Sequence, residues 1–555
     1  METGALRVPG DRARSEGMST RMDEAPENVR LIGGEMLLWS DMSNMGGITD
    51  WRGAALELIR RMIPASGRVL LVGPHPQALV DEVVELAPEA AALVRSYPDA
   101  CALGSRHPGL EVFCGRLELL DSGESYDLVV AIDGLARTHS AEAPASGWQE
   151  SVAALAALIA PGGRLVLGVH NDLGIDRFIE ARPADREGGD DQWAPHGFDP
   201  TYPSGPPAVD RGLECAGLSV LRRYAAYPGR QAPRALLAGE ALAGDLPDAL
   251  TFPLSARGGD RLLAADPLRL TRVVFRHRLG EELAPLWVAV AARPPVAPGA
   301  EDDLPLGLIE EGPALYEFTG TATRRLPDGE ERQIPTGRVV EEILVEACAR
   351  EDVKAVRDLL THLAGWLEGG GSVVGAADSL VHDGVRFAAI SPPAAPSTQP
   401  EPRVVLCRIL WRFAVRLLAA GHHHPWPWPL EADQLALTLC GMAGRPCDRG
   451  DLDRARKFDA ELGQPAEPAE QAPTYRDLLG ARDRLADQLT AALARIARLE
   501  TKLTYREREL VRSKSRLRRT QRKATAYRRS LGYRLSRRLA RPRKVARRVI
   551  RLLSG

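Results

Sequence analysis

The chain has 555 residues and carries 72 Lys and Arg against 74 Asp and Glu, for a formal net charge of −2. This length suits two to four domains with sizeable cores. No apolar run approaches the ~18 residues that a membrane-spanning helix needs, and the first residues lack the apolar segment of a secretory signal. We therefore expect a cytoplasmic protein.

The seven cysteines are scattered along the chain, and no two of them form a CxxC pair. This spacing predicts neither a disulfide framework nor a zinc site, so no metal is expected. The cysteines are Cys101, Cys114, Cys215, Cys348, Cys407, Cys440 and Cys447.

Charge is distributed very unevenly. Residues 506–555 hold 20 Lys and Arg against 2 Asp and Glu, a net of +18, so the other 505 residues carry about −20. A block of this kind calls for an anionic counterpart, either lipid or nucleic acid.

Residues 1–28 are polar and are expected to be disordered. A helix is predicted from about residue 49, with Thr49 or Asp50 as its cap. Its apolar face is expected to comprise Trp51, Ala55, Leu58 and Met62.

Short apolar strands then alternate with helices. The strands are predicted at Arg68–Val72, Ala91–Arg95, Leu110–Cys114, Tyr126–Ile132 and Arg164–Val169. A capping box at 146–149 is expected to start the helix that follows the fourth strand, and the sequence Pro-Gly-Gly at 161–163 is expected to end it. This alternation predicts a parallel sheet with helices on both faces.

Beyond residue 200 we expect a helix at Val209–Ala216, strands at Leu218–Ala225 and Leu286–Ala291, and an insertion between these two strands. The texture changes near residue 304, where an α+β domain over 304–460 is predicted. Its elements would be a hairpin at 314–334 turning at Pro327-Asp328-Gly329, two helices within 338–368, a proline-rich loop at 391–403, and helices at 406–417 and 431–443.

Residues 461–474 have the composition of a linker, and residues 475–531 show a heptad repeat. One series is Leu489, Ile496, Leu503, Leu510, Leu517, Ala524 and Leu531; the other is Leu478, Leu485, Ala492 and Leu499. These are a and d positions, so the segment predicts a coiled coil that makes a homo-oligomer. A basic amphipathic tail follows at 532–555.

Three segments carry a family resemblance: YDLVVAIDGL from Tyr126, ALIAPGGRLVLGV from Ala157, and the continuation HNDLG from His170. With them, residues 50–295 resemble class I S-adenosylmethionine-dependent methyltransferases, in particular those of bacterial polysaccharide and cell-wall glycopolymer gene clusters. The resemblance implies an α/β fold with a Rossmann-like methyltransferase domain at 29–296, followed by the α+β domain and the coiled-coil helix. It also implies S-adenosylmethionine as cofactor.

The resemblance places the methionine end of the cofactor at the turn after the first strand, here Gly73, Pro74 and His75. The ribose would lie beside the end of the second strand, where Arg95 stands in place of the usual acid. The adenine would lie between residues after the third and fourth strands, which are Gly115, Arg116, Asp133 and Gly134.

Two of these positions have a second interpretation. Gly73 either lets the backbone approach the cofactor or only makes a tight turn. Asp133 either binds adenine or substrate, or caps the next helix.

Two histidines are candidate catalytic bases, because imidazole can remove a hydroxyl proton near neutral pH. His139 follows the fourth strand, and His170 ends the fifth. Their structural alternatives are a solvated loop residue and a strand-end hydrogen-bonding residue. The segment Gln192–Tyr202 suits either a sugar-binding lid or a surface loop.

Residues 305–460 distantly resemble a kinase-like domain found after some of these methyltransferases, with Asp378 in the place of the catalytic aspartate. The metal-binding asparagine and later aspartate have no counterpart, which favours a degenerate domain. His422-His423-His424 could suggest a metal, but adjacent side chains point in different directions and favour a packed loop.

The leading hypothesis is a methyltransferase that acts on a hydroxyl of a surface glycan or its lipid-linked precursor. The runner-up is a non-catalytic scaffold in a glycan-assembly complex. The tail would bind an anionic membrane surface, since apolar residues interleave with its cations; nucleic acid is the competing partner.

Overall fold

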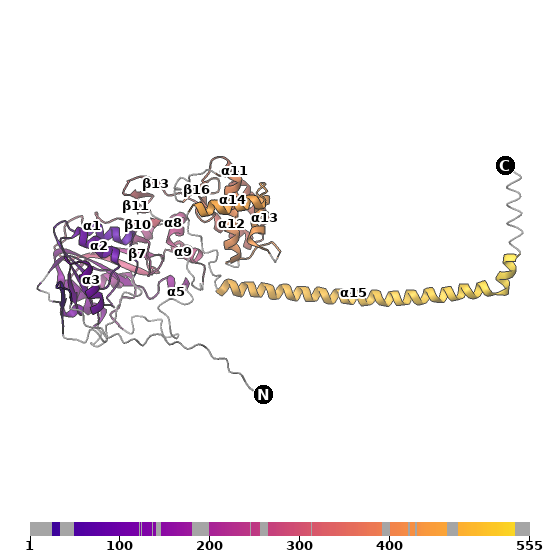
Figure 1. Cartoon of the computed structure of the whole chain (residues 1–555), viewed down its shortest axis with the longest axis horizontal. Helices are drawn as coiled ribbons and strands as arrows, with labels where there is room; N and C mark the ends of the chain where they lie inside the picture. The colour runs from indigo at the N-terminus through magenta and orange to yellow at the C-terminus, as the bar shows by residue number, and fades with distance from the viewer. Residues whose placement is uncertain are drawn as a thin grey trace, which may run out of the picture. The chain divides into compact units, whose positions relative to one another are not determined.

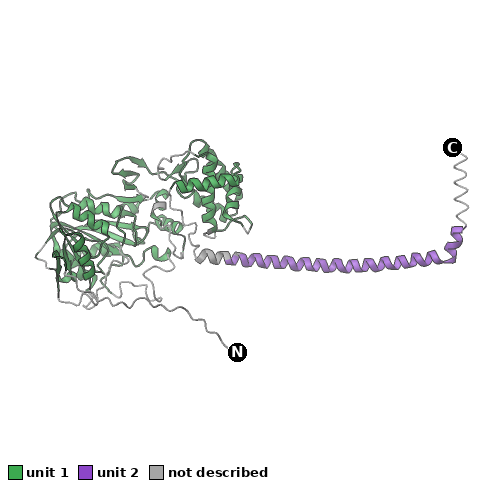
Figure 2. Ribbon diagram, viewed as in Figure 1, with its two compact units in different colours: residues 1–478 green, residues 479–555 purple. Residues whose placement is uncertain are grey.

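The computed structural model describes residues 25–33, 49–120, 123, 125–135, 137–139, 146–179, 199–244, 246–255, 265–311, 314–390, 400–419, 422–427, 430–462 and 475–538. It divides into two compact units, residues 1–478 and residues 479–555 (Figure 2). Most of the expected N-terminal disorder, the 463–474 part of the linker, the 391–399 part of the proline-rich loop and the 539–555 part of the tail lie outside the described residues.

The first unit is built on a large sheet whose first half is parallel. Its strands are β1 (Val29–Leu31), β2 (Arg68–Val72), β3 (Glu89–Val94), β4 (Glu111–Cys114), β5 (Tyr126–Ala131) and β6 (Ile159–His170). They lie in the order β1-β4-β3-β2-β5-β6, and every neighbouring pair is parallel. From β2 the chain runs outward through β3 and β4 and then returns to the other side of β2 with β5. This reversal opens a crevice at the carboxyl ends of the strands, where sheets of this kind bind ligands.

Helices cover both faces of the sheet. One face packs against α1 (Ala54–Met62), α2 (Gln77–Leu86) and α3 (Tyr97–Arg106), which Figure 1 labels; the other packs against α4 (Trp148–Leu158), α6 (Pro206–Cys215) and α9 (Pro267–Arg276). Val69 and Leu71 of β2 enter the first core, whereas Leu70 and Val72 enter the second. Because both faces are buried, these strands read as continuous apolar runs, and the predicted parallel sheet is confirmed.

The other half of the sheet is antiparallel. Its strands are β7 (Ser219–Tyr227), β8 (Ala235–Ala238), β9 (Leu286–Ala292), β10 (Gly307–Glu311), β11 (Ala314–Phe318), β12 (Ala322–Leu326) and β13 (Glu331–Gln333). β9 lies between β6 and β7 and is antiparallel to both. The order then continues β8-β10-β11-β12-β13.

Two expectations for this half can be compared with the structure. The insertion expected between β7 and β9 is present and contains β8, α7 (Gly239–Ala243), α8 (Asp248–Leu254) and α9. Residues 307–333, expected to open a separate domain, instead extend the main sheet, because β10 pairs with β8. The hairpin turn at 327–329 joins β12 to β13.

Residues 338–462 form a helical part with its own core. It contains α10 (Val340–Ala349), α11 (Val353–Glu368), α12 (Pro402–Ala419), α13 (Ala432–Met442) and α14 (Arg449–Glu461), with a small sheet of β14 (Arg338–Val339), β15 (Leu380–His382) and β16 (Phe387–Ala389). Asp459 of α14 accepts hydrogen bonds from the buried side chains of Arg408 (2.6 Å) and Arg412 (2.9 Å) of α12. This buried charge cluster fastens α14 to α12.

Three local predictions differ from the structure. Helix α1 begins at Ala54 rather than at residue 49, because the Thr49 and Asp50 amides bond to Asp133 and Gln231 and Gly53, with φ 65°, turns the chain before the helix. The capping box of α4 is not built on Ser146: its N-cap is Gly147, whose amide donates a hydrogen bond to the Glu150 carboxylate (3.2 Å). In addition, Asp199 and Thr201 accept bonds from the first amides of that helix.

The Pro-Gly-Gly sequence at 161–163 lies within β6 rather than after a helix end. Helix α4 ends at Leu158 and β6 begins at the next residue. Tyr126 pairs with Ile159 but Leu128 pairs with Arg164, so the chain between these two β6 residues forms an irregularity in the ladder.

The described part of the second unit is almost entirely helical. Helix α15 runs from Tyr475 to Arg529, and residues 531–538 are helical again. Among the described residues, no helix is long and apolar enough to cross a bilayer. The remaining short elements are η1 (Leu117–Leu119) and α5 (Asp176–Ile179), both in the first unit.

Candidate functional site

The candidate site residues all follow the carboxyl ends of parallel strands. Gly73 follows β2, Arg95 follows β3, Gly115 follows β4, Asp133 follows β5, and His170 ends β6. Because the strands are parallel, all five lie along the same edge of the sheet. The structure gives them different surroundings along that edge.

The turn after β2 requires a glycine. Gly73 has a backbone φ of +91°, a conformation that residues with a side chain rarely adopt. Its amide donates to the Leu93 carbonyl (2.8 Å) of the neighbouring strand. A Cβ at this position would meet nothing closer than the Thr138 methyl at 3.9 Å. The backbone conformation therefore explains the glycine, while the space beside it stays open for a ligand.

The same turn forms one wall of a cleft of about 510 Å³. Its floor is β2 and β3 and its sides are α2 and α3; the residues lining it include Gly73, Pro74, His75, Asp99 and Leu103. Two other hollows of this unit have volumes of only about 20 and 40 Å³, room for little more than ordered water. The cleft thus has room for a small organic ligand within the first unit.

His75 supplies the cleft with an unusual polar group. Its side chain is buried, and its Nδ1 lies 2.9 Å from the Gly73 carbonyl oxygen. Since a carbonyl only accepts, Nδ1 carries the proton and Nε2 presents a lone pair. That Nε2 is buried and has no hydrogen-bond partner among the described residues.

Burial also fixes the charge of His75. Loss of solvent lowers the pKa of the imidazole to about 4, and the bond to Gly73 opposes this only partly. The ring is therefore neutral near pH 7. His75 lines the cleft, and its Nε2 is an acceptor for which the described chain supplies no hydrogen-bond donor.

A polar network closes one end of the cleft. The Asp81 carboxylate of α2 accepts hydrogen bonds from Gln77 (2.8 Å) and Arg106 (3.1 Å), and it lies 3.1 Å from His107 Nε2. The bond from Gln77, with support from Arg106, lowers the pKa of Asp81. This network holds the start of α2 against the end of α3.

The residues after β3 and β4 do not line the cleft. Arg95 is buried at the end of β3, and its carbonyl lies 3.6 Å from the Cys114 thiol. A Cβ on Gly115 would lie 2.3 Å from the Ile32 carbonyl oxygen, so glycine is needed for the chain after β1 to pass. Arg116 caps the short helix η1.

The residues after β5 have structural partners. The Asp133 carboxylate accepts a hydrogen bond from the Thr49 amide (3.2 Å) and lies 3.5 Å from the Arg137 guanidinium. Burial raises the pKa of Asp133, while the Thr49 bond and Arg137 lower it. Asp133 therefore anchors the chain that leads into α1, and Gly134, with φ +82°, makes the turn that follows.

His139 lies between two polar side chains. Its Nδ1 is 3.2 Å from the Glu118 carboxylate and its Nε2 is 3.4 Å from the Ser151 hydroxyl. A carboxylate at Nδ1 fixes the orientation and tautomer of an imidazole, as in general-base sites. The histidine is thus part of an ordered polar group and is not a freely solvated loop residue.

His170 is packed beneath the end of the expected lid. The Tyr202 hydroxyl donates to the His170 carbonyl (2.9 Å), and the Tyr202 ring lies edge-on to Trp148, 6.4 Å between centroids. Of the Gln192–Tyr202 segment, only residues 199–202 are described. The side-chain amide of the following Asn171 donates hydrogen bonds to the carbonyls of Glu282 and Ala284, so this residue has a structural role.

The other motifs singled out from the sequence are also placed. His422 lies 3.5 Å from Asp266, whereas His423 lies 2.9 Å from Glu351, so these adjacent histidines face different partners. Asp378 forms an ion pair with Arg416, which also binds Glu341. The carboxylate in the expected kinase-like position is thus held in a core ion pair.

Sequence reasoning missed two features. Asp99 is buried in the first turn of α3 and lines the cleft. Three cysteines of the helical part also come together. A carboxylate near the start of the helix after the second strand was a usable signal for the first, but only tertiary structure reveals the second.

No protein-family model matches the chain, and no curated protein matches it in sequence. Among solved structures it is similar to the N-methyltransferase NodS of Bradyrhizobium japonicum WM9 in complex with S-adenosyl-l-homocysteine, at 12% identity over 43% of this chain and 84% of that one, with a TM-score of 0.24. It is also similar to the CcbJ methyltransferase of Streptomyces caelestis, at 15% identity over 43% of this chain and 88% of that one, with a TM-score of 0.26.

The S-adenosylmethionine-bound aminopentose methyltransferase CalS10 of Micromonospora echinaspora is 26% identical over 20% of this chain and 46% of that one, with a TM-score of 0.18. The strand order and pairing of the first unit make it a mixed α/β structure.

Proposed function

We propose that the first unit is an S-adenosylmethionine-dependent methyltransferase and that it acts on a hydroxyl of a surface glycan or of its lipid-linked precursor. The observation that carries the proposal is the cleft beside the Gly73–His75 turn, which the neutral His75 lines. Two further features support it: the reversal of strand order at β2 and β5, and the antiparallel strand β9 placed between β6 and β7.

The cleft residues fit such a cofactor. Gly73 leaves space at the turn, His75 Nε2 can accept a hydrogen bond from an amino or hydroxyl group, and Asp99 brings a carboxylate to the same cleft. Bound S-adenosylmethionine would supply an electrophilic methyl group. The adjacent α2–α3 network would keep the cleft walls in place.

The chemistry left to this chain is positioning and proton removal. His139, oriented by Glu118, would take the proton from the acceptor hydroxyl, with His170 at the end of β6 as the other candidate. Alignment of the acceptor oxygen with the methyl group would supply most of the rate enhancement.

One specific observation favours a second function, the non-catalytic scaffold. Arg95 is buried at the end of β3, where the family resemblance implies an acid for the ribose. Under this alternative the first unit has lost its cofactor and the long helix recruits the enzymes of a glycan-assembly complex.

Calorimetric titration of the full chain with S-adenosylmethionine, and with its demethylated product, separates the two. The enzyme proposal expects saturable binding at or below the millimolar range, equivalent to about −4 kcal/mol or better. His75→Asn should weaken it about 2- to 12-fold, the effect of one hydrogen bond. His423→Asn, at a histidine that does not line the cleft, is the matched control. No heat at millimolar ligand would refute the enzyme and leave the scaffold.

The acceptor is tested separately. Full-length protein with methyl-labelled S-adenosylmethionine is incubated with lipid-linked glycan extracts or with protein-free polysaccharide. Label in a base-stable ether of either glycan supports a hydroxyl acceptor. Label found only in protein or small amines would contradict it, even if the cofactor binds.

We also propose that α15 pairs with a second copy of itself and that the basic tail holds the assembly on an anionic membrane surface. The heptad side chains are exposed in the single helix: Leu489 is 62% exposed, Ile496 51% and Leu503 62%. Each Lys or Arg near such a surface contributes about 1 kcal/mol. Co-sedimentation with anionic vesicles should fall on removal of residues 532–555; equal pelleting of both proteins would contradict membrane binding.

A further inference from the structure

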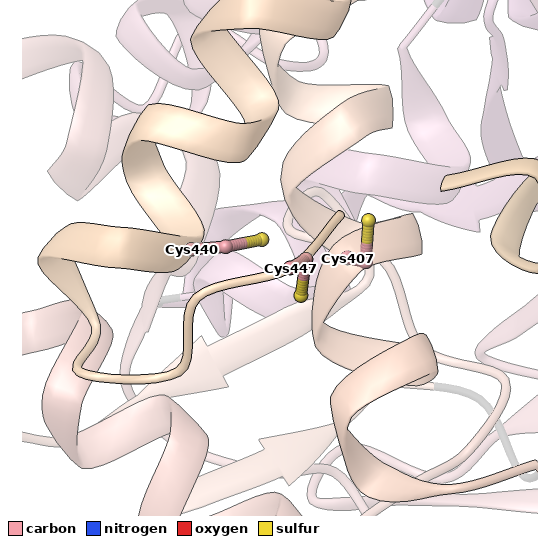
Figure 3. A group of neighbouring side chains, drawn as sticks. All are labelled: Cys407, Cys440 and Cys447. Carbon is pink, nitrogen blue, oxygen red and sulfur yellow. The ribbon is translucent and has the colours of Figure 1, made fainter. Parts of the chain in front are cut away.

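Three of the seven cysteines meet in the helical part of the first unit. Cys407 comes from α12, Cys440 from α13, and Cys447 from the loop between α13 and α14, and their sulfurs all lie within 4.8 Å of one another. Figure 3 shows Cys440 reaching from its helix towards the loop that carries Cys447, with Cys407 beside it. None of the three belongs to the cleft described above.

The spacing of the sulfurs suits a metal better than a disulfide. Thiolates that share a zinc ion at about 2.3 Å in tetrahedral geometry lie roughly 3.7 Å apart. Since no two of the sulfurs are more than 4.8 Å apart, binding needs a contraction of at most about 1 Å. A disulfide needs sulfurs about 2.05 Å apart and leaves the third thiol unused. Soft sulfur ligands favour ions such as zinc.

The burial of the three thiols differs in a useful way. Cys407 and Cys440 are buried, whereas Cys447 is partly exposed. The Cys447 thiol donates weak hydrogen bonds to the carbonyls of Arg445 (3.5 Å) and Arg403 (3.8 Å). Rotation about its Cα–Cβ bond would turn the sulfur towards the other two at little cost, and the exposed side gives an ion a way in.

The surroundings favour thiolates at this position. Cys447 directly precedes Asp448, the N-cap of α14, and helix N-termini stabilise anions. The nearby Asp451 carboxylate is held by Arg403 (3.0 Å) and by Arg454.

We propose that Cys407, Cys440 and Cys447 bind one zinc-class divalent ion through three thiolates, with the fourth coordination position facing solvent beside Cys447. Three sulfur–metal bonds form, the three thiol protons pass to solvent, and nothing is oxidised or reduced. The site carries one negative charge, which the two arginines around Asp451 balance. The ion would fasten the α13–α14 loop to α12.

The test uses the full-length chain, reduced and freed of metal, titrated with Co²⁺ as a spectroscopic substitute for zinc. We expect one equivalent to bind with the intense near-ultraviolet absorption of thiolate-to-cobalt charge transfer, and zinc to displace it. Cys447→Ser should weaken binding by at least about tenfold. Cys215→Ser, at an exposed cysteine outside the cluster, should bind like wild type.

A second measurement, on the wild-type chain, tests the proposal even if the Cys447→Ser variant fails to fold. In the wild-type chain, zinc should slow alkylation of Cys447, and a chelator should restore its rate. Absence of the charge-transfer band, equal affinity in Cys447→Ser, or alkylation that zinc does not slow would each overturn the proposal. A stable disulfide between two of the three cysteines, with no metal uptake after reduction, would overturn it in favour of a redox pair.

Discussion

The buried imidazole of His75 should make the stability of the first unit depend on pH. Unfolded, a histidine titrates near pH 6.5; folded, burial lowers the pKa of His75 to about 4. Because the folded value is the lower one, the unfolded chain takes up the proton first as pH falls. The contribution of His75 to the free energy of unfolding is therefore fully present above about pH 6.5 and is lost as the pH falls from about 6.5 to 4.

The size of this effect follows from the two values. At pH 5 the unfolded histidine is almost fully protonated and the folded one is about one-tenth protonated, which costs roughly 2 kcal/mol relative to pH 8. The loss approaches roughly 3 kcal/mol near pH 4. A change of this size is a large fraction of the stability of an ordinary domain.

The assay is urea unfolding of wild type and His75→Asn at pH 8 and pH 5, followed by tryptophan fluorescence. Asparagine can place its amide N–H where Nδ1 donates to Gly73, yet it cannot be protonated in this range. Wild type should lose about 2 kcal/mol of stability between pH 8 and pH 5 that the variant keeps, so the stability of the variant relative to wild type should rise by about 2 kcal/mol. Equal pH dependence in wild type and variant would refute the reasoning, and His423→Asn should follow wild type.

Three other perturbations have defined outcomes. Asp459→Ala leaves Arg408 and Arg412 buried without their carboxylate and should lower the free energy of unfolding in urea by about 3–5 kcal/mol. The control Asp358→Ala, at a fully exposed ion pair, should leave the urea midpoint unchanged. Equal effects of the two substitutions would contradict a stabilising role for the buried cluster. Gly168→Ala should prevent soluble expression, because its Cβ would lie 1.7 Å from the Ile132 carbonyl oxygen, whereas Gly109→Ala, with nothing within 4 Å, should express normally. Ile496→Asn combined with Leu503→Asn should lower the mass found by sedimentation equilibrium if α15 pairs with a second copy; an unchanged mass would place the contact elsewhere.

Much of the α/β part follows from the sequence. Strand β2 begins and ends at the predicted residues, and β3, β4 and β5 fall within two residues of theirs, because strands buried on both faces form short apolar runs bounded by turns. The periodicity of α15 and of the helices within 338–368 is equally local. What the sequence determined alone is which segments become strands and helices.

Only the tertiary structure decided how these segments pair and cap. Residues 307–333 read locally as the start of a new domain, yet β10 finds the free edge of β8 and extends the sheet. The start of α4 is satisfied by Asp199 and Thr201, some fifty residues along the chain. Such partners are set by three-dimensional packing, which leaves no mark on local periodicity.

The same distinction between local pattern and long-range packing applies to the functional residues. The Gly73–His75 turn was visible because it lies between a predicted strand and helix. The burial of His75, the place of Asp99 in the cleft wall and the meeting of Cys407, Cys440 and Cys447 depend on distant segments coming into contact. Sequence spacing separates those three cysteines by up to 40 residues, and the packing of α12 and α13 brings their sulfurs together.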